Sequence, residues 1–218
     1  MLSDIRIILG LCLFTVGVYE YFGSNSSTGE SFQVNDSYPR MAELFESMAS
    51  LKESGTFSDL TIEAGKAKFQ VHKAILSARS KVFHSMLQER KELNKITIED
   101  MSEVAVGEML SYIYTGHTKE SSLDIVLELF CAGDVYKLEL LKEICSDILV
   151  TNLNVDNVID FLTLSSKHGD KKLEKAAVYF VAKNAINVRK NSNWLKFVAT
   201  HPRLADQVIE ALCTKEQN

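Results

Sequence analysis

One stretch, residues 57–83, combines two hydrophobic periods and constrains the fold more than any other part of the chain. Residues 60–64 alternate, with leucine, isoleucine and alanine on one face and polar side chains on the other. After Gly65 and a lysine, residues 68–71 resume the alternation. Period-2 patterning on both sides of a glycine turn predicts a β-hairpin. From His72 onward the apolar positions recur at helical spacing, so the hairpin is expected to run directly into short helices.

Elsewhere the spacing of apolar residues predicts one more short strand, over residues 95–99, and otherwise helices. The helices are expected over residues 40–54, 102–114, 122–130 and 138–149, and throughout the tail from residue 151. Gly55 and Gly116 follow the first two helices, where glycine commonly ends a helix. Three short strands among many helices predict the α+β fold class.

Composition excludes several classes of function. The net charge of −5 argues against a nucleic-acid-binding protein, because phosphate binding needs clustered Lys and Arg. The four cysteines have neither Cys-x-x-Cys spacing nor a histidine at metal-ligand spacing. Cys131 and Cys145 lie in apolar helical patterns, where a reduced thiol behaves as a small hydrophobic side chain. A reducing compartment, the cytoplasm or nucleus, is therefore expected.

The sequence does not predict an enzyme. None of the five histidines has an Asp, Glu or Cys at a spacing typical of a catalytic triad or metal site, and no phosphate-binding loop occurs. His72, between strand and helix, is interpreted as a structural histidine that hydrogen-bonds the hairpin. The charged residues 167–175 are interpreted as a solvated face. No catalytic residue, cofactor or metal is expected.

The N-terminal residues 1–39 are interpreted as an apolar leader followed by a polar linker. Residues 7–19 form an uncharged apolar run of 13 residues, which is short for a membrane span. A signal-peptide core, a short membrane anchor, a peripheral helix and a non-native leader all remain as interpretations. Membrane association through residues 7–19 is thus kept as an alternative.

The helix expected over residues 40–54 carries a narrow apolar stripe of Leu44, Met48 and Leu51. These positions follow i, i+4, i+7 spacing and therefore share one face. That face needs a surface to pack against. Its own domain and a partner subunit are equally consistent with the pattern.

Three motifs carry a family resemblance: FSDLTI at 57–62, FQVHKAILSARS at 69–80 and YIYTG at 112–116. Together they resemble the BTB/POZ domain, most closely the speckle-type POZ (MATH-BTB) group, and the similarity continues to about residue 212. The resemblance implies a BTB/POZ fold, a small three-stranded sheet flanked by helices. Residues 40–150 would hold this domain with a preceding dimerisation helix, and 151–218 an all-α extension similar to the 3-box and BACK helices. Residues 1–39 are too short for a MATH domain.

The resemblance also implies a homodimer. Leu44, Met48 and Leu51 match contact positions on the dimerisation helix, and Ile75 matches another. Asp59 and Lys73 match charged positions that often lie at the dimer-proximal pocket. Without the resemblance, these two charges would be an ordinary surface pair.

The same resemblance implies binding to cullin-3 and a role as adaptor or regulator of a cullin-3 ubiquitin ligase. The family presents a hydrophobic-x-Glu motif after its second short helix, where this chain has a shorter loop and only Leu87-Gln88-Glu89. Tyr112 and Tyr136 match the cullin-facing surface, although both could instead be core aromatics. Expected partners are a second copy, related BTB proteins, cullin-3 and a substrate protein of open identity. The alternatives are a BTB scaffold or dominant-interfering dimer partner without ligase function, and a membrane-tethered protein.

Overall fold

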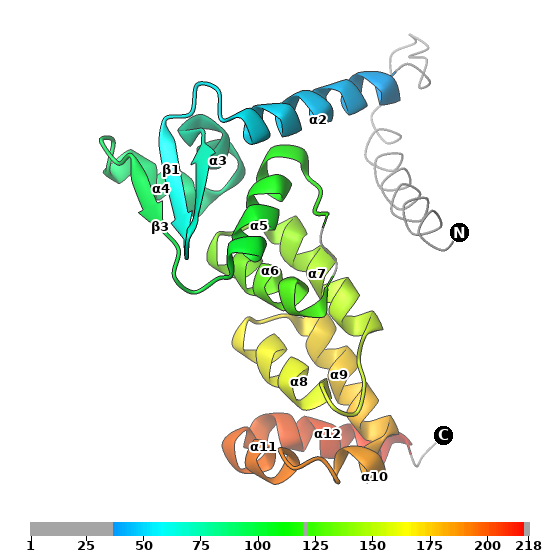
Figure 1. Ribbon diagram of the computed structural model, residues 1–218. Coiled ribbons are helices and arrows are strands. Elements are labelled where there is room, and N and C mark those ends of the chain that lie inside the picture. Colours follow the sequence, from blue (N-terminus) through cyan, green and yellow to red (C-terminus); the bar gives the residue numbers. More distant parts are fainter. Residues whose placement is uncertain (1–36, 120–121, 216–218) are drawn as a thin grey trace, which may run out of the picture. The chain divides into compact units, whose positions relative to one another are not determined.

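The computed structural model describes residues 37–119 and 122–215, with side chains from 41 to 119 and from 122 to 213 (Figure 1). The described residues from 43 onward form one compact unit. The elements are α2 (Ser37–Ser54), β1 (Leu60–Ala64), β2 (Ala67–Val71), α3 (Lys73–Arg79), α4 (Lys81–Glu89), β3 (Lys95–Thr97), α5 (Glu103–Thr115), α6 (Leu123–Val135), α7 (Glu139–Thr151), α8 (Val158–Lys167), α9 (Lys171–Lys183), α10 (Ala185–Val188), α11 (Trp194–Thr200) and α12 (Pro202–Lys215). The predicted α+β class is confirmed.

The sheet has three strands in the order β2-β1-β3. Strands β1 and β2 form the predicted antiparallel hairpin, with Ile62 opposite Phe69. Gly65 turns the chain with a φ of +55°, in the left-handed region that glycine adopts without strain. Strand β3 pairs with β1 in parallel, which places Ile96 beside Ile62. It is shorter than the strand expected over 95–99, because Ile98 adds only one further bond, to the carbonyl of Glu63 at 2.8 Å.

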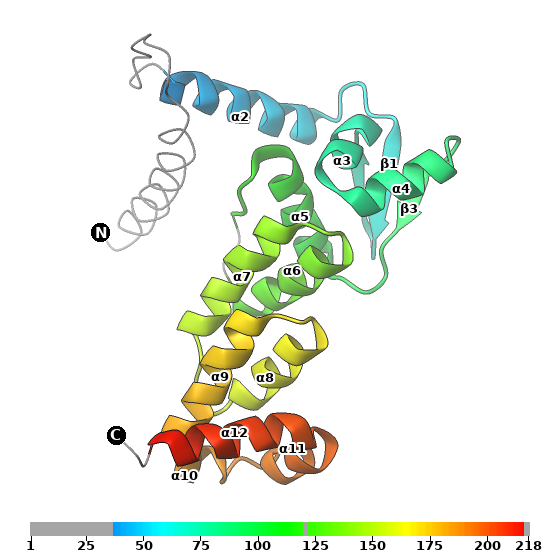
Figure 2. The same cartoon turned by 180° about the vertical axis from the view of Figure 1, so that it is seen from behind.

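Helices α3 and α4 lie over one face of this sheet (Figure 2). The inward positions of β1 are fully buried, as their alternation predicts. Leu76 of α3 and Phe83 of α4 have no exposed surface. These residues share a core with α5, α6 and α7, so the hairpin and the helices after it form one hydrophobic unit.

Local sequence signals set the helix ends. Ser102 accepts the N–H of Ala105 at 3.2 Å and caps α5, which ends at Gly116 with a φ of +75°. Ser80 caps α4 by accepting the N–H of Phe83, and its own hydroxyl donates to the carbonyl of Tyr136 at 2.6 Å. That second bond ties the first helix pair to the end of α6.

From α8 onward the chain is helical, as the sequence predicts. A second hydrophobic cluster, which includes Leu162 and Val181, joins these helices. Leu173 of α9 and Phe161 of α8 belong to the first cluster instead. The helical extension therefore packs directly against the sheet-containing part of the unit.

The apolar run 7–19 and most of the linker lie outside the described residues. Among the helices that the structure does describe, none has the length and apolar character needed to cross a membrane.

Candidate interaction surfaces

Helix α2 contacts α5 and His117, which lies just after the end of α5. Lys52 Nζ donates to Ser111 Oγ at 2.8 Å, and the Phe45 ring meets the edge of His117 with centroids 5.5 Å apart. Burial lowers the pKa of Lys52, an effect that the charge of Glu108 partly offsets. These contacts fix one side of the helix.

The apolar stripe on α2 is divided between two environments. Met48 is partly buried against the core of its own chain, and Ile75 of α3 packs on the same core. Leu51 is half-buried, whereas Leu44 has 59% of its surface exposed. Packing on its own domain thus explains why Met48 is apolar, whereas most of the Leu44 side chain lies in solvent.

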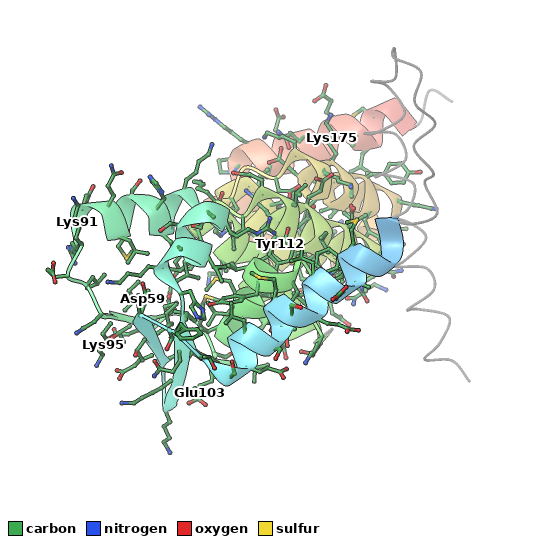
Figure 3. The ribbon with its side chains drawn as sticks, turned by 90° about the horizontal axis from the view of Figure 1, so that it is seen from above. Asp59, Lys91, Lys95, Glu103, Tyr112 and Lys175 are labelled. Carbon is green, nitrogen blue, oxygen red and sulfur yellow. The ribbon has the colours of Figure 1, made fainter. Side chains whose placement is uncertain are left out.

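Asp59 and Lys73 do not form the surface ion pair that their charges suggested. Asp59 Oδ1 accepts the main-chain N–H of Lys73 at 2.8 Å, while Lys73 Nζ donates to the carbonyl of Lys91 at 3.2 Å. The His72 side chain makes no cap bond at the start of α3. Asp59, the residue directly before β1, caps α3 instead, and it lies near the end of the sheet (Figure 3).

His72 connects three parts of the chain, in agreement with its structural interpretation. Its Nε2 lies 2.8 Å from the carbonyl of Thr56, and its Nδ1 lies 2.7 Å from the hydroxyl of Tyr114. Because a carbonyl only accepts, Nε2 carries the proton, and Nδ1 accepts from Tyr114. The same hydroxyl accepts the main-chain N–H of His72 at 2.9 Å. The ring therefore fixes the junction between the hairpin and α3.

The four residues matched to a cullin-facing surface are not equally accessible. Leu87 is 7% exposed and Tyr112 is 5% exposed, and both belong to the core. In Figure 3 Tyr112 lies among the helices, away from the loop at Lys91. Tyr136 is half-buried and stacks on Phe83 with ring centroids 4.8 Å apart. The interpretation of Tyr112 and Tyr136 as core aromatics fits this geometry. Glu89 is the one exposed member of the set.

The structure brings together four side chains that no sequence motif groups, and we call them the thiol cluster: Cys131, Asp134, Lys142 and His168. Cys131 Sγ lies 3.7 Å from His168 Nε2, and His168 Nδ1 lies 3.0 Å from Asp134 Oδ2. The sequence has no Cys, Asp or Glu at a motif spacing from a histidine, yet the fold brings a Cys and an Asp to His168. Their separations, 37 and 34 residues, match no short motif, so sequence spacing could not reveal them.

Residues 167–175 are likewise not a uniformly solvated face. His168 lies in the cluster, and Glu174 is 5% exposed while accepting from Lys171 Nζ at 2.9 Å. Within 37–119 and 122–215, no group of His, Cys, Asp and Glu has the geometry to hold a metal ion.

A pocket of about 210 Å³ opens beside α6. Its lining comes from α6, from Tyr136 and from the segment that leads into α5, and consists of Asp100, Met101, Leu127, Glu128, Cys131, Ala132, Val135 and Tyr136. Most of these side chains are apolar, with two carboxylates among them. The pocket and the thiol cluster share Cys131.

Comparison with known proteins agrees with the motifs. The family described as BTB/POZ domain matches residues 48–153. The chain is similar to TD and POZ domain-containing protein 2 of Mus musculus, with 32% identity over 79% of this chain and 49% of the relative. It is also similar to TD and POZ domain-containing protein 5 of the same organism, with 35% identity over 74% of this chain and 48% of the relative. The chain thus spans about half the length of these curated relatives, whose names are TD and POZ rather than speckle-type POZ.

The chain is also similar to two solved structures. One is the BTB domain of zebrafish PATZ1, with a TM-score of 0.47 and 22% identity over 57% of this chain and 100% of that one. The other is the BTB domain of human gigaxonin, with a TM-score of 0.44 and 25% identity over 56% of this chain and 97% of that one.

Proposed function

This chain contains a BTB/POZ domain at residues 48–153, a protein-interaction module, and we propose that it acts as a dimerising adaptor or regulator of a cullin-3 ubiquitin ligase. BTB domains generally pair with themselves or with related BTB domains. The specific partners, the ligase role and the absence of catalysis in this protein are parts of the proposal.

The observation that carries the dimer is the exposed Leu44. Burying a leucine side chain contributes roughly 1.5–3 kcal/mol, so the 59% exposure of Leu44 leaves a stabilising contact unused. Leu51 is half-buried about two helical turns further along the same face and extends the stripe. In the proposed dimer a second copy covers Leu44 and Leu51, while Met48 and Ile75 support them from the core.

The cullin-3 contact is proposed at the end of α4. Glu89 is exposed there, and the partly exposed Tyr136 lies beside Phe83 of the same helix. The helices α8 and α9 supply an all-α extension packed on the domain, as a 3-box-like element would. Since Leu87 is buried, the contact depends on Glu89 and Tyr136 and not on a projecting leucine.

The buried position of Leu87 favours a second candidate function, a scaffold or interfering dimer partner without cullin-3. Such a chain would pair with a related BTB protein and occupy its dimer surface. If the chain is an adaptor, a related BTB protein paired with it would bind the substrate.

Titration calorimetry with the N-terminal region of cullin-3 separates the two functions. The adaptor account expects micromolar or tighter binding to the intact chain, and its loss in Glu89→Lys. Asp206→Lys is the control, since it makes a similar charge change at an exposed position on α12. Absence of binding by the unmodified chain, or equal loss in both variants, would reject the adaptor and leave the scaffold.

We also propose that the protein works in the cytoplasm or nucleus, with membrane association through residues 7–19 as the alternative. Free thiols at Cys131, Cys145 and Cys213 support a reducing compartment. Carbonate-resistant membrane association of the full chain would reject this placement, and release into the carbonate supernatant would support it.

A further inference from the structure

The thiol cluster lies at the junction between the BTB domain and the helical extension. Cys131 and Asp134 come from α6, Lys142 comes from α7, and His168 follows α8 directly. The His168 side chain is 10% exposed and its ring meets Phe130 edge-on with centroids 5.7 Å apart. The imidazole is therefore held in place on several sides.

The hydrogen bonds of His168 define which of its nitrogens carries the proton. Nδ1 lies 3.0 Å from Asp134 Oδ2, and an ionised carboxylate can only accept. Nδ1 is thus the protonated nitrogen, and Nε2 presents a lone pair. That lone pair lies 3.7 Å from Cys131 Sγ, within reach of a thiol proton. A nucleophile, a base and a group that orients the base are the parts of an activated-cysteine site.

Asp134 is fixed in the ionised form that this arrangement needs. Lys142 Nζ donates to Asp134 Oδ1 at 2.9 Å and to the carbonyl of His168 at 2.6 Å. The bond from Lys142, together with that from His168, lowers the pKa of Asp134 to about 2. The carboxylate of Asp134 therefore keeps its charge throughout the neutral range and can accept from His168 Nδ1.

The pocket beside α6 gives this thiol an opening to small molecules. Met101, Leu127 and Val135 provide an apolar lining next to Cys131. Its volume of about 210 Å³ is small, and admits a molecule of a few heavy atoms. Asp100 and Glu128 add negative charge, which disfavours anions.

We propose that Cys131 is a covalent modification site for small, uncharged electrophiles such as α,β-unsaturated carbonyl compounds, with His168 as its general base and Asp134 as the positioning residue. The assignment is independent of the dimer and of the cullin-3 contact. It concerns a stoichiometric adduct and no turnover.

The addition balances without a co-reactant. His168 Nε2 takes the thiol proton as sulfur forms a bond to the β-carbon of the electrophile. The π electrons move toward the carbonyl, and the resulting enolate takes the proton back from the imidazolium at its α-carbon. The product is a thioether, and His168 returns to its starting tautomer.

The charged surroundings explain why the base is required. Burial raises the pKa of the Cys131 thiol, Lys167 lowers it, and Asp134, Glu128 and Asp100 raise it further. The thiol therefore rests in its protonated form near neutral pH, where an unassisted cysteine is a weak nucleophile. Proton transfer to His168 during the attack removes this barrier.

The test follows alkylation of the intact chain by N-ethylmaleimide at neutral pH, with peptide mass spectrometry resolving each cysteine. Cys213 is exposed on α12 and serves as the internal reference. We expect half-buried Cys131 to react faster than Cys213. His168→Gln should slow Cys131 by about 10²-fold, the usual effect of general-base assistance, with no change at Cys213. Lys175→Gln, at an exposed position on α9, should leave both rates unchanged.

A second comparison needs no variant, so it decides the matter even where His168→Gln fails to fold. The rate ratio of Cys131 to Cys213 should be several times higher for N-ethylmaleimide than for a maleimide that carries a carboxylate, because Asp100 and Glu128 repel the anion. Slower reaction at Cys131 than at Cys213 with both reagents would overturn the proposal. So would an unchanged Cys131 rate in a folded His168→Gln protein.

Discussion

The carboxylate of Asp59 accepts the main-chain N–H of Lys73 at 2.8 Å, so a residue before the first strand caps the helix that follows the second. The hairpin brings these two residues together, with Leu60 opposite Val71 in register. Asp59 thereby supplies the helix capping that the His72 side chain does not. The hairpin and α3 are stabilised as one unit.

The first prediction separates this cap from an ion pair. Asp59→Ala should lower the free energy of unfolding by about 1 kcal/mol, the usual effect of losing a cap. Lys73→Ala should change it little, because the main-chain N–H remains. Urea denaturation followed by circular dichroism measures both. An equal loss in the two variants would indicate a side-chain ion pair and contradict the cap.

The second prediction concerns Gly133, where α6 and α7 approach closely. A Cβ at this position would lie 2.9 Å from the backbone nitrogen of Lys142 and 3.0 Å from its Cα. Because backbone cannot yield as a side-chain tip can, Gly133→Ala should destabilise the chain by about 1–3 kcal/mol.

Gly107, also within a helix, is the matched control for Gly133. Its added Cβ would meet the Phe69 ring at 3.5 Å, an ordinary contact. Gly107→Ala should therefore be neutral or stabilising by up to about 1 kcal/mol, from the higher helix propensity of alanine. Thermal unfolding should show a lower melting temperature for Gly133→Ala and an unchanged or higher one for Gly107→Ala. A melting temperature for Gly133→Ala at or above that of the unmodified chain would contradict it.

The third prediction is a pH dependence that originates at Asp134. Its folded-state pKa of about 2 lies below the ordinary 3.8, so its contribution to stability is fully present above pH 3.8. That contribution is lost as the pH falls toward 2, where the folded carboxylate also takes up a proton. The stability gap between the unmodified chain and Asp134→Asn should thus be largest near neutral pH and shrink in acid.

Denaturation at a series of pH values measures this gap. Asp147→Asn is the control, because the ion pair of Asp147 with Lys172 is more than half exposed and should contribute little. A gap for Asp134→Asn that is constant with pH, or one that widens in acid, would show that Asp134 does not act through its charge.

Local patterns predicted most of the fold. The alternation over residues 60–64 and the turn at Gly65 defined the hairpin, and Gly116 marked the end of α5, because each signal acts within a few residues. The parallel pairing of β3 with β1 could not be predicted in this way. It joins residues far apart in sequence, and periodicity carries no information about which strands pair.

The interaction surfaces were predictable only in part. The spacing of Leu44 and Met48 reveals an apolar stripe on α2. It does not reveal that the chain's own core covers Met48 and leaves Leu44 exposed. Leu87 and Tyr112 match motif positions, but tertiary packing decides whether such positions are exposed, and here it buries both. The contact of Cys131 with His168 arises because α6 and the turn after α8 meet in the folded chain, which no local signal records.

We propose that this chain dimerises through α2, and size-exclusion chromatography with light scattering measures the mass of the assembly. The intact chain should elute at twice the mass of one chain, and Leu44→Asp at the mass of one. Leu195→Asp, at an 80% exposed leucine on α11, is the control and should remain dimeric. A monomeric intact chain, or a Leu44→Asp protein that keeps the mass of two chains, would contradict the account.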